Sequence, residues 1–358
     1  QLLWIVAKLF SLPEDPVTHA ERLAALRAEL AHAGVDGFLV PRADEHLGEY
    51  VPPAGERLAW LTGFTGSAGL AVVLADRAVL FTDGRYTTQA AQQTDPALWD
   101  RRHITEEPPA AWLREHAAGL RIGYDPWLHA EAGLQRLEEA GVTLVPLAAN
   151  PIDAIWADRP APPMAPALVH PAEFAGRAAA EKRAEAAAAL RAAGQDAAVL
   201  ADAHSIAWLL NIRGGDLAHT PLVLGFGLLR ADAGADLFVE PGKIGPEVRT
   251  HLGNDVAVQP RAALPAALAA LRGRHVRLDA EATPAWFAQA LRAAGAVVEG
   301  GEDPCRMPRA CKNAVEQQGA RAAHARDAVA MARFLAWFAE AAPRGGLTEI
   351  VAAERLLA

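Results

Sequence analysis

One arginine, Arg85, has the chemistry and the position to bind a polar ligand. It lies in Thr82–Tyr86 (TDGRY), directly after an apolar run, and the ends of strands are where α/β sheets hold ligand groups. A planar guanidinium can donate two parallel hydrogen bonds to a carboxylate or a carbonyl group. The neighbouring Asp83 is a simpler partner, and from these residues alone we favour a structural ion pair over a ligand site.

The glycine-rich segment before this arginine, Gly63–Gly69 (GFTGSAG), fits neither of two known catalytic motifs. A phosphate loop leads into a helix that begins with lysine, whereas an apolar strand pattern follows here and no lysine is present. A nucleophile elbow has glycine two residues before the serine, but Thr65 holds that position relative to Ser67. We therefore interpret Ser67 as a turn residue.

The elements that would position Arg85 form an α/β domain, which we assign to residues 16–150. Two apolar runs joined by three residues predict a hairpin of buried strands just before the arginine, and helix-forming residues resume just after it. Thr18 and Glu21 predict a capping box at the start of the first helix, and Gly34 predicts its end. The predicted helices are Thr18–Ala33, Tyr86–Gln93 and Ala130–Ala140, and the predicted strands are Gly37–Val40, Gly69–Leu74, Ala78–Thr82, Arg121–Tyr124 and Val142–Pro146.

Composition indicates a globular α/β protein of two or three domains. The chain has 358 residues, of which 52% are hydrophobic. A net charge of -9 argues against nucleic acid or an anionic membrane as a partner, because both attract basic surfaces. Two cysteines are too few for a disulfide scaffold, so we expect a cytoplasmic protein. Residues 1–15 are apolar at first but too short to span a bilayer, and we interpret them as an uncertain leader or a first strand.

A proline-rich linker, residues 151–170, precedes what we interpret as a second copy of the same domain, residues 171–303. Ala207-Trp208-Leu209 repeats Ala59-Trp60-Leu61 in the same order of helix, strand, tryptophan turn and hairpin. The alternative is that two unrelated α/β domains share the order of helix, glycine and strand by chance. The second copy has Glu240-Pro241-Gly242 in place of the segment with Arg85. Its predicted helices are Ala172–Ala193 and Pro284–Ala294, and its predicted strands are Ala197–Leu200, Leu222–Leu229, Ala235–Glu240, Val276–Asp279 and Val297–Val298.

Residues 304–358 are predicted to begin a third domain. Cys305 and Cys311 have no neighbouring ligands that would complete a zinc site, so we interpret them as isolated thiols. A long amphipathic helix follows at Ala314–Ala341, and Thr348 caps another helix. Two helices bury little by themselves. Their apolar faces therefore imply something more to pack against.

Several separated motifs together resemble the three-domain form of aminopeptidase P, the Xaa-Pro aminopeptidases of the creatinase and prolidase-related metallopeptidases. The resemblance runs from about Pro16 to Ala358. It rests on Gly63–Gly69 (GFTGSAG), Thr82–Tyr86 (TDGRY), Ile155–Pro160 (IWADRP), Ile206–Gly214 (IAWLLNIRG), Arg321–His324 (RAAH) with Asp327, and Gly345–Glu349 (GGLTE).

The resemblance implies two creatinase-type α/β domains followed by a pita-bread α+β catalytic domain, of which this chain would contain only the first helices. It implies an enzyme that removes an N-terminal residue preceding proline with two divalent metal ions, typically manganese, held by two Asp, one His and two Glu. It also implies peptides with proline at the second position as substrates, and a homodimer. None of the five ligands has a matching position in this chain, so we expect no bound metal and no peptidase activity from these residues alone, whether the chain is a fragment or a natural truncation.

By the same resemblance, Arg85 is predicted to contact substrate, in its own or a partner subunit, with Asp83 and Gly84 positioning it. We expect Gly84 to allow an unusual backbone turn, and we expect Tyr86, Trp60 and His324 to pack or hydrogen-bond. Two alternatives stay open. The chain could be a non-catalytic binding or dimerisation module. The chain could also belong to an enzyme of different chemistry, because creatinase uses the same architecture without metal.

Overall fold

The computed structural model describes residues 18–358, so the prediction for residues 1–15 lies outside the described part. The chain divides into two compact parts. The larger contains residues 18–169 and Ala179–Arg309, and the smaller contains His170–Ala178 and Ala310–Ala358.

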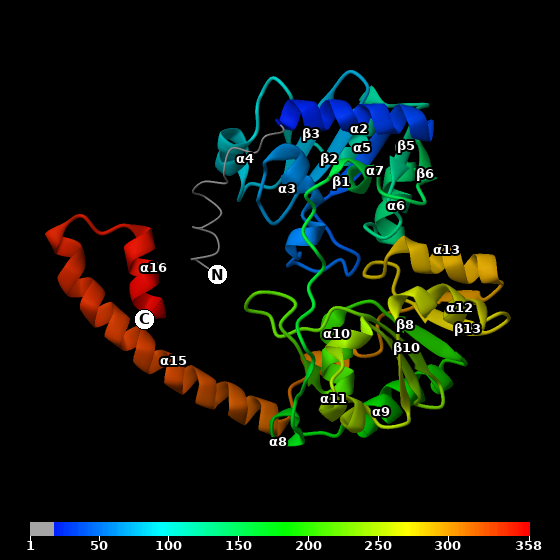
Figure 1. Cartoon of the computed structure of the whole chain (residues 1–358), viewed down its shortest axis with the longest axis vertical. Coiled ribbons are helices and arrows are strands. Elements are labelled where there is room, and N and C mark those ends of the chain that lie inside the picture. Colours follow the sequence, from blue (N-terminus) through cyan, green and yellow to red (C-terminus); the bar gives the residue numbers. More distant parts are fainter. Residues whose placement is uncertain (1–17) are drawn as a thin grey trace. The chain divides into compact units, whose positions relative to one another are not determined.

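The first sheet of the larger part has six strands in the order β4-β3-β2-β1-β5-β6 (Figure 1). The predicted hairpin is present, since β2 and β3 pair antiparallel with Leu70 opposite Phe81. β1 pairs antiparallel with β2 and parallel with β5. The strands are β1 Gly37–Pro41, β2 Leu70–Leu74, β3 Ala78–Thr82, β4 Asp100–His103, β5 Arg121–Tyr124 and β6 Thr143–Pro146.

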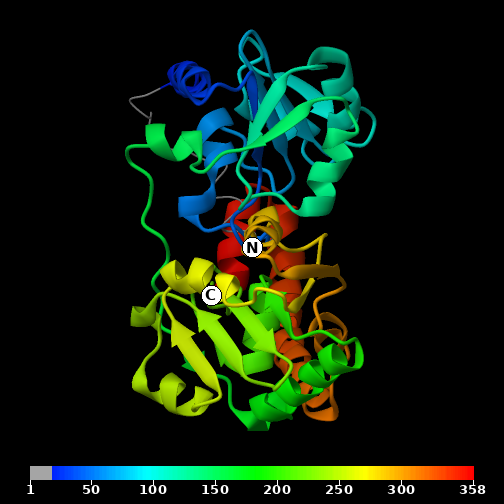
Figure 2. The ribbon, with the colours of Figure 1, turned by 90° about the vertical axis from the view of Figure 1, so that its right-hand side faces the viewer.

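The second sheet repeats this topology strand for strand, in the order β12-β11-β10-β8-β13-β14. Figure 2 shows several of its strands as green and yellow arrows. The central hairpin is again antiparallel, and the outer pairs are again parallel. The prediction of two tandem copies of one α/β domain with a mixed sheet is therefore confirmed. The strands are β8 Ala197–Leu200, β10 Phe226–Arg230, β11 Ala235–Phe238, β12 Val256–Gln259, β13 His275–Leu278 and β14 Val297–Gly300.

Equivalent side chains make equivalent contacts in the two copies. Asp36, just before β1, donates its N–H to the Arg121 carbonyl at 2.7 Å and accepts the Arg121 N–H at 2.8 Å. Asp196, just before β8, makes the same two bonds with His275, both at 2.8 Å. Each aspartate thus fixes the register of two neighbouring parallel strands, and the duplication extends to individual hydrogen bonds.

The repeated tryptophans also have a common role. Arg22 donates to the Trp60 carbonyl and lies 4.6 Å from the centroid of its ring. Lys182 donates to the Trp208 carbonyl at 3.0 Å and lies 4.7 Å from that ring. In each copy, a buried cation of the long first helix therefore anchors the short helix that carries the tryptophan. It does so through one hydrogen bond and one cation–π contact.

Helices cover both faces of each sheet, and their apolar side chains form the two cores of each domain. Thr18 and Glu21 form the predicted capping box, and Gly34 ends α2 in the left-handed region. The helices are α2 His19–Ala33, α3 Arg57–Thr62, α4 Thr87–Gln93, α5 Pro109–His116, α6 Glu131–Glu138, α7 Pro151–Ile155, α8 Ala172–Ala175, α9 Ala179–Ala192, α10 Ala203–Leu210, α11 Pro246–Leu252, α12 Leu264–Ala269, α13 Ala285–Ala294 and α14 Arg306–Ala310. Short pieces are η1 Pro53–Gly55, β7 Leu168–Val169, β9 Ile212–Arg213, η2 Pro241–Lys243 and η3 Arg261–Ala263.

Two predictions about helices were wrong. The linker predicted at 151–170 begins with helix α7, because proline is tolerated in the first helical turn and the Asn150 side chain caps that turn. The helix predicted at Ala172–Ala193 is two helices, α8 and α9. Gly176 ends α8 at φ +70°, and a Cβ there would lie 2.4 Å from Asn313 Oδ1.

The strand predicted at Leu222–Leu229 was also placed too early. β10 begins at Phe226, because the residues before it bond to the loop that precedes them and not to the sheet. Leu222 accepts from the Asp216 N–H at 3.2 Å, and Leu224 donates to the Asp216 carboxylate at 2.7 Å.

The smaller part contains the long predicted helix, α15 Ala314–Ala341, then η4 Ala342–Arg344 and α16 Glu349–Leu357. Asn313 and Glu316 form a capping box, and the Asn313 amide donates to the Ala175 carbonyl of α8 at 2.8 Å. No residue of α15 is buried by the described residues. The prediction that its apolar face packs on something more stays a prediction.

Candidate functional site

Arg85 lies at the carboxyl edge of the first sheet, between β3 and α4, as predicted. Its backbone N–H donates to Asp83 Oδ1 at 3.0 Å, and its Nη2 donates to Asp83 Oδ2 at 2.7 Å. The Arg85 side chain is 63% exposed, and Nη1 takes no part in these bonds. The ion pair favoured from the local residues is therefore present, and it leaves one edge of the guanidinium open to solvent.

Asp83 anchors this arginine electrostatically. The hydrogen bond from Arg85 holds the pKa of the Asp83 carboxyl below its usual value, and the same bond raises the pKa of Arg85. Both groups therefore stay charged over the whole neutral range. The pair is exposed, so it contributes little to stability. It restricts where the guanidinium points.

The expectation for Gly84 was wrong in its stated reason. Gly84 is not among the glycines with positive φ, so its backbone adopts a conformation open to other residues. A Cβ at this position would lie 3.4 Å from His103 Nε2, which is an ordinary contact. Neither geometry nor space requires glycine here.

The aromatic and hydroxyl side chains beside Arg85 support the loop. The Tyr86 ring lies 5.0 Å from the Arg85 guanidinium carbon, and its hydroxyl is 2.6 Å from Ser67 Oγ. Phe64 meets the Tyr86 ring edge-on at 5.9 Å. Ser67 thus links the glycine-rich turn to the start of α4. Trp60 lies deeper, stacked on Trp156 at 5.3 Å.

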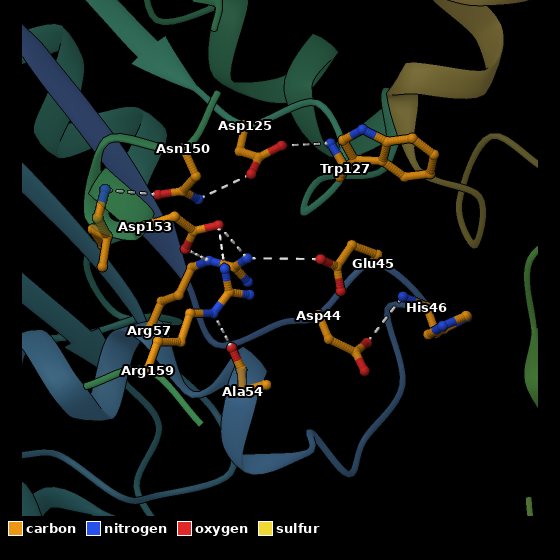
Figure 3. Close-up of polar contacts among 11 residues, drawn as sticks. Asp44, Glu45, His46, Ala54, Arg57, Asp125, Trp127, Asn150, Asp153 and Arg159 are labelled. Carbon is orange, nitrogen blue, oxygen red and sulfur yellow. Dashed lines mark hydrogen bonds and ion pairs between the residues drawn. The ribbon is translucent and has the colours of Figure 1, made fainter. Parts of the chain in front are cut away.

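A second group of charged side chains lies at the same sheet edge, with one buried member and three partly exposed ones (Figure 3). We call it the Arg57 cluster: Glu45, Arg57, Asp153 and Arg159. Arg57 is 2% exposed and donates to both oxygens of Asp153, at 2.7 and 2.9 Å. Its Nη2 also lies 3.6 Å from Glu45 Oε1, and Arg159 Nη1 lies 2.6 Å from Asp153 Oδ2.

Carboxyl groups next to this cluster have perturbed pKa values for identifiable reasons. Burial raises the pKa of Asp44, and burial likewise raises the pKa of Asp125 despite a hydrogen bond from Asn150 at 2.9 Å. Burial would also raise the pKa of Glu45, but the charges of Arg57 and Arg261 outweigh it and bring that pKa below its usual value. Glu45 therefore stays ionised beside Arg57.

The Arg57 cluster was missed from the sequence. Arg57 was given no role, and Asp153 was assigned to a linker. The available signal was Ile155–Pro160, because Trp156 and Arg159 of that motif contact Trp60 and Asp153. The charges of the cluster are matched by one another, so its chemistry suits holding α3 and α7 together.

The second copy lacks an arginine at the position of Arg85. Glu240 precedes the 3-10 helix η2 there, and Pro241 and Gly242 begin it. The other residues singled out from the sequence lie apart from Arg85 along the chain. Cys305 is buried and Cys311 is exposed, both as free thiols, and His324 Nδ1 lies 2.8 Å from the Ala320 carbonyl within α15.

Two searches of residues 18–358 were negative. No group of three or more His, Cys, Asp or Glu side chains in this part is arranged to hold a metal ion. Among the same residues, no helix is both long enough and apolar enough to cross a membrane.

Comparison with family models finds two adjacent matches. Residues 22–155 and residues 158–316 each match a model of the creatinase/prolidase N-terminal domain. Both matches coincide with the two sheets described above. The duplication seen in the topology is thus also seen in the family models.

Two relatives with long matches have the same name. The chain is 35% identical over 346 residues to a probable Xaa-Pro aminopeptidase P of Coccidioides posadasii, covering 92% of this chain and 53% of that protein. It is 36% identical over 341 residues to a protein of the same name from Neosartorya fischeri, covering 90% and 52%. The chain therefore spans about half the length of the curated relatives it matches.

A solved structure shares the fold. The crystal structure of an X-prolyl aminopeptidase from Caenorhabditis elegans superposes with a TM-score of 0.87 at 28% identity, over 95% of this chain and 59% of that one. The worm protein is described as a cytosolic enzyme with a di-nuclear active site.

Proposed function

We propose, from the premise that the chain belongs to the creatinase/prolidase family, that it is the N-terminal part of a Xaa-Pro aminopeptidase. The observation that carries this proposal is the match over 92% of the chain to a protein of that name, together with the TM-score of 0.87 to the worm enzyme. The reaction would be hydrolysis of the bond between an N-terminal residue and a following proline.

The two metal ions of such an enzyme do not fit the residues described. The worm enzyme has a di-nuclear active site, whereas residues 18–358 contain no group of three or more metal-binding side chains. We therefore assign the metals, with manganese as the proposed identity, to a part of the longer relatives that this chain does not cover. No hydrolytic step is assigned to the residues of this chain.

Arg85 is the residue of this chain that we propose to contact the peptide. Its Nε and Nη2 are held by Asp83, which leaves Nη1 to donate to a carbonyl or carboxylate oxygen. Asp83 is proposed as the positioning residue, since it orients the guanidinium and keeps it charged. Gly84 is proposed only as a small residue in the turn between them.

The partners and location follow from the same proposal. The substrates would be peptides with proline at the second position, and the assembly would be a homodimer. A net charge of -9 supports neither a nucleic-acid nor a membrane partner. We propose a cytoplasmic protein, as the two unpaired cysteines and the cytosolic worm relative suggest.

Hydrolysis of an Arg-Pro-Pro peptide with added manganese tests the proposal. The 358-residue chain alone should release no arginine. A fusion of this chain to the remaining half of the Coccidioides relative should release it, and the relative's half alone should be less active. Activity from the 358-residue chain alone would contradict the assignment of the metals. An inactive fusion that still binds two manganese ions would contradict the proposed reaction.

A further inference from the structure

A groove of about 560 Å³ lies at the opposite end of β3 from Arg85, where the strands β3 and β4 begin. This volume is in the range of small-ligand sites in proteins. The groove is separate from the proposed peptide contact, because it opens at the amino edge of the sheet. Its lining includes Arg27, Asp76, Arg77, Trp99, Asp100 and Arg101.

Two of the groove's arginines are anchored to backbone but not neutralised. Arg27 Nε donates to the Leu74 carbonyl at 2.9 Å, and Arg101 Nη1 donates to the Ala91 carbonyl at 3.2 Å. Within residues 18–358, neither guanidinium has a carboxylate within ion-pair distance, and the terminal nitrogens of Arg27 make no hydrogen bond. Each guanidinium is therefore held in place with donors to spare.

The carboxylates of the groove are engaged by other arginines. Asp76 pairs with Arg77 at 2.9 Å, and Asp100 pairs with Arg102 at 2.6 Å. Asp76 is the nearest acidic influence on Arg27. Even so, burial is the larger effect and lowers the pKa of Arg27, so this guanidinium is partly desolvated without full compensation.

A buried aromatic side chain also lines the groove. Trp99 is 1% exposed, and its Nε1 has no hydrogen-bond partner in the described part of the chain. Buried donors in native proteins are rarely left without an acceptor. The positive charge and the unused donors of the groove come from the two guanidinium groups, and the indole forms part of its wall.

We propose that this groove binds a small anion that carries a phosphate or carboxylate group. Arg27 and Arg101 would donate to its oxygens from two sides, because a guanidinium fork matches the geometry of both groups. Arg77 would contribute through its charge once the anion competes with Asp76. The site is independent of the proposed peptidase function.

Titration calorimetry of the 358-residue chain with inorganic phosphate and with citrate tests this proposal. We expect saturable binding at one site, weakened at least tenfold by Arg27→Gln or Arg101→Gln, because a charged hydrogen bond contributes about that factor. Arg114→Gln is the control for net charge, since Arg114 is on α5 and outside the groove lining, and it should bind as the parent chain does. Binding of phosphate alone, or of citrate alone, would identify the recognised group.

Two further measurements guard against variants that lose the fold. Asp76→Asn removes a competing carboxylate, so it should tighten binding several-fold without removing a donor. The Trp99 indole N–H resonance, assigned with Trp99→Phe, should shift as the anion is added. The proposal is overturned if neither anion binds at millimolar concentration, if Arg114→Gln weakens binding as much as the groove variants, or if binding leaves the Trp99 resonance unmoved.

Discussion

Asp153→Asn tests the contribution of the buried ion pair in the Arg57 cluster. The substitution keeps the shape of the side chain but removes its charge. Arg57 is 2% exposed and, among residues 18–358, would keep Glu45 at 3.6 Å as its ion-pair partner. Removing one partner of a buried pair costs about 3 to 5 kcal/mol. Because Glu45 remains and Asp153 is itself 29% exposed, we expect the low end of that range, about 3 kcal/mol.

The chain contains a matched control with the same chemistry at the surface. Asp83 pairs with Arg85 through both oxygens at a shortest distance of 2.7 Å, as Asp153 does with Arg57, but the Arg85 side chain is 63% exposed. Asp83→Asn should therefore leave stability unchanged within error. The residue types of the two pairs are the same, and the two variants differ in burial and in the number of pairs removed, since Asp153 also pairs with Arg159 at 2.6 Å.

Urea denaturation followed by circular dichroism measures the free energy of unfolding of both variants. A loss of about 3 kcal/mol corresponds to a fall of about 6 to 12 °C in the melting temperature of a domain of this size. Adding Arg57→Met to Asp153→Asn should recover part of the loss, because it removes the unpaired buried charge. Equal stability of Asp153→Asn and Asp83→Asn would refute the reasoning that burial decides the contribution of these pairs.

Three further predictions test other parts of the structure. In a longer, active protein, Arg85→Ala should lower kcat/KM by about tenfold with an unchanged melting temperature, and Arg85→Lys should be intermediate; unchanged kinetics would leave only the ion pair with Asp83. Burial lowers the pKa of His129 to about 4, so the folded state binds fewer protons than the unfolded one, and stability should fall by about 3 kcal/mol as the pH drops from 6.5 to 4. His129→Gln should flatten that slope in urea titrations at each pH, and an identical slope would contradict the assignment. Gly63→Ala should destabilise more than Gly119→Ala, because both have φ near +80° but only the Cβ at Gly63 would lie 2.7 Å from a backbone carbonyl oxygen; equal melting temperatures would count against this contact.

Local signals predicted much of the framework. The capping box at Thr18 and the bounds of α15 Ala314–Ala341 were readable because capping and helical periodicity act over a few residues. The duplication was predictable because helix, strand, tryptophan turn and hairpin recur in the same order, and each tryptophan contacts a cation, Arg22 in one copy and Lys182 in the other. These features are fixed by neighbours in sequence or by a repeated pattern.

Long-range features escaped prediction for physical reasons. Arg57 and Asp153 are 96 residues apart, so neither segment alone indicates a buried pair. Strand β4 lies at the edge of its sheet and consists of polar residues, which hides the apolar pattern of a strand. The break at Gly176 depends on Asn313, which is distant in sequence. For Arg85, the residues indicated the ion pair, whereas the substrate role rests on the family resemblance.

The arrangement of the carboxyl edge explains why Arg85, rather than another residue of the first domain, is the candidate for contact with a ligand. The loop after β1 is occupied by the second domain, since His46 stacks on Phe226 at 4.5 Å and hydrogen-bonds the Ala201 backbone. The loop after β5 is occupied in the same way, because Trp127 stacks on Trp286 at 4.0 Å. The loop after β3 presents an exposed guanidinium instead. Two of these three loops therefore hold the domains together, whereas the third leaves the Arg85 side chain 63% exposed.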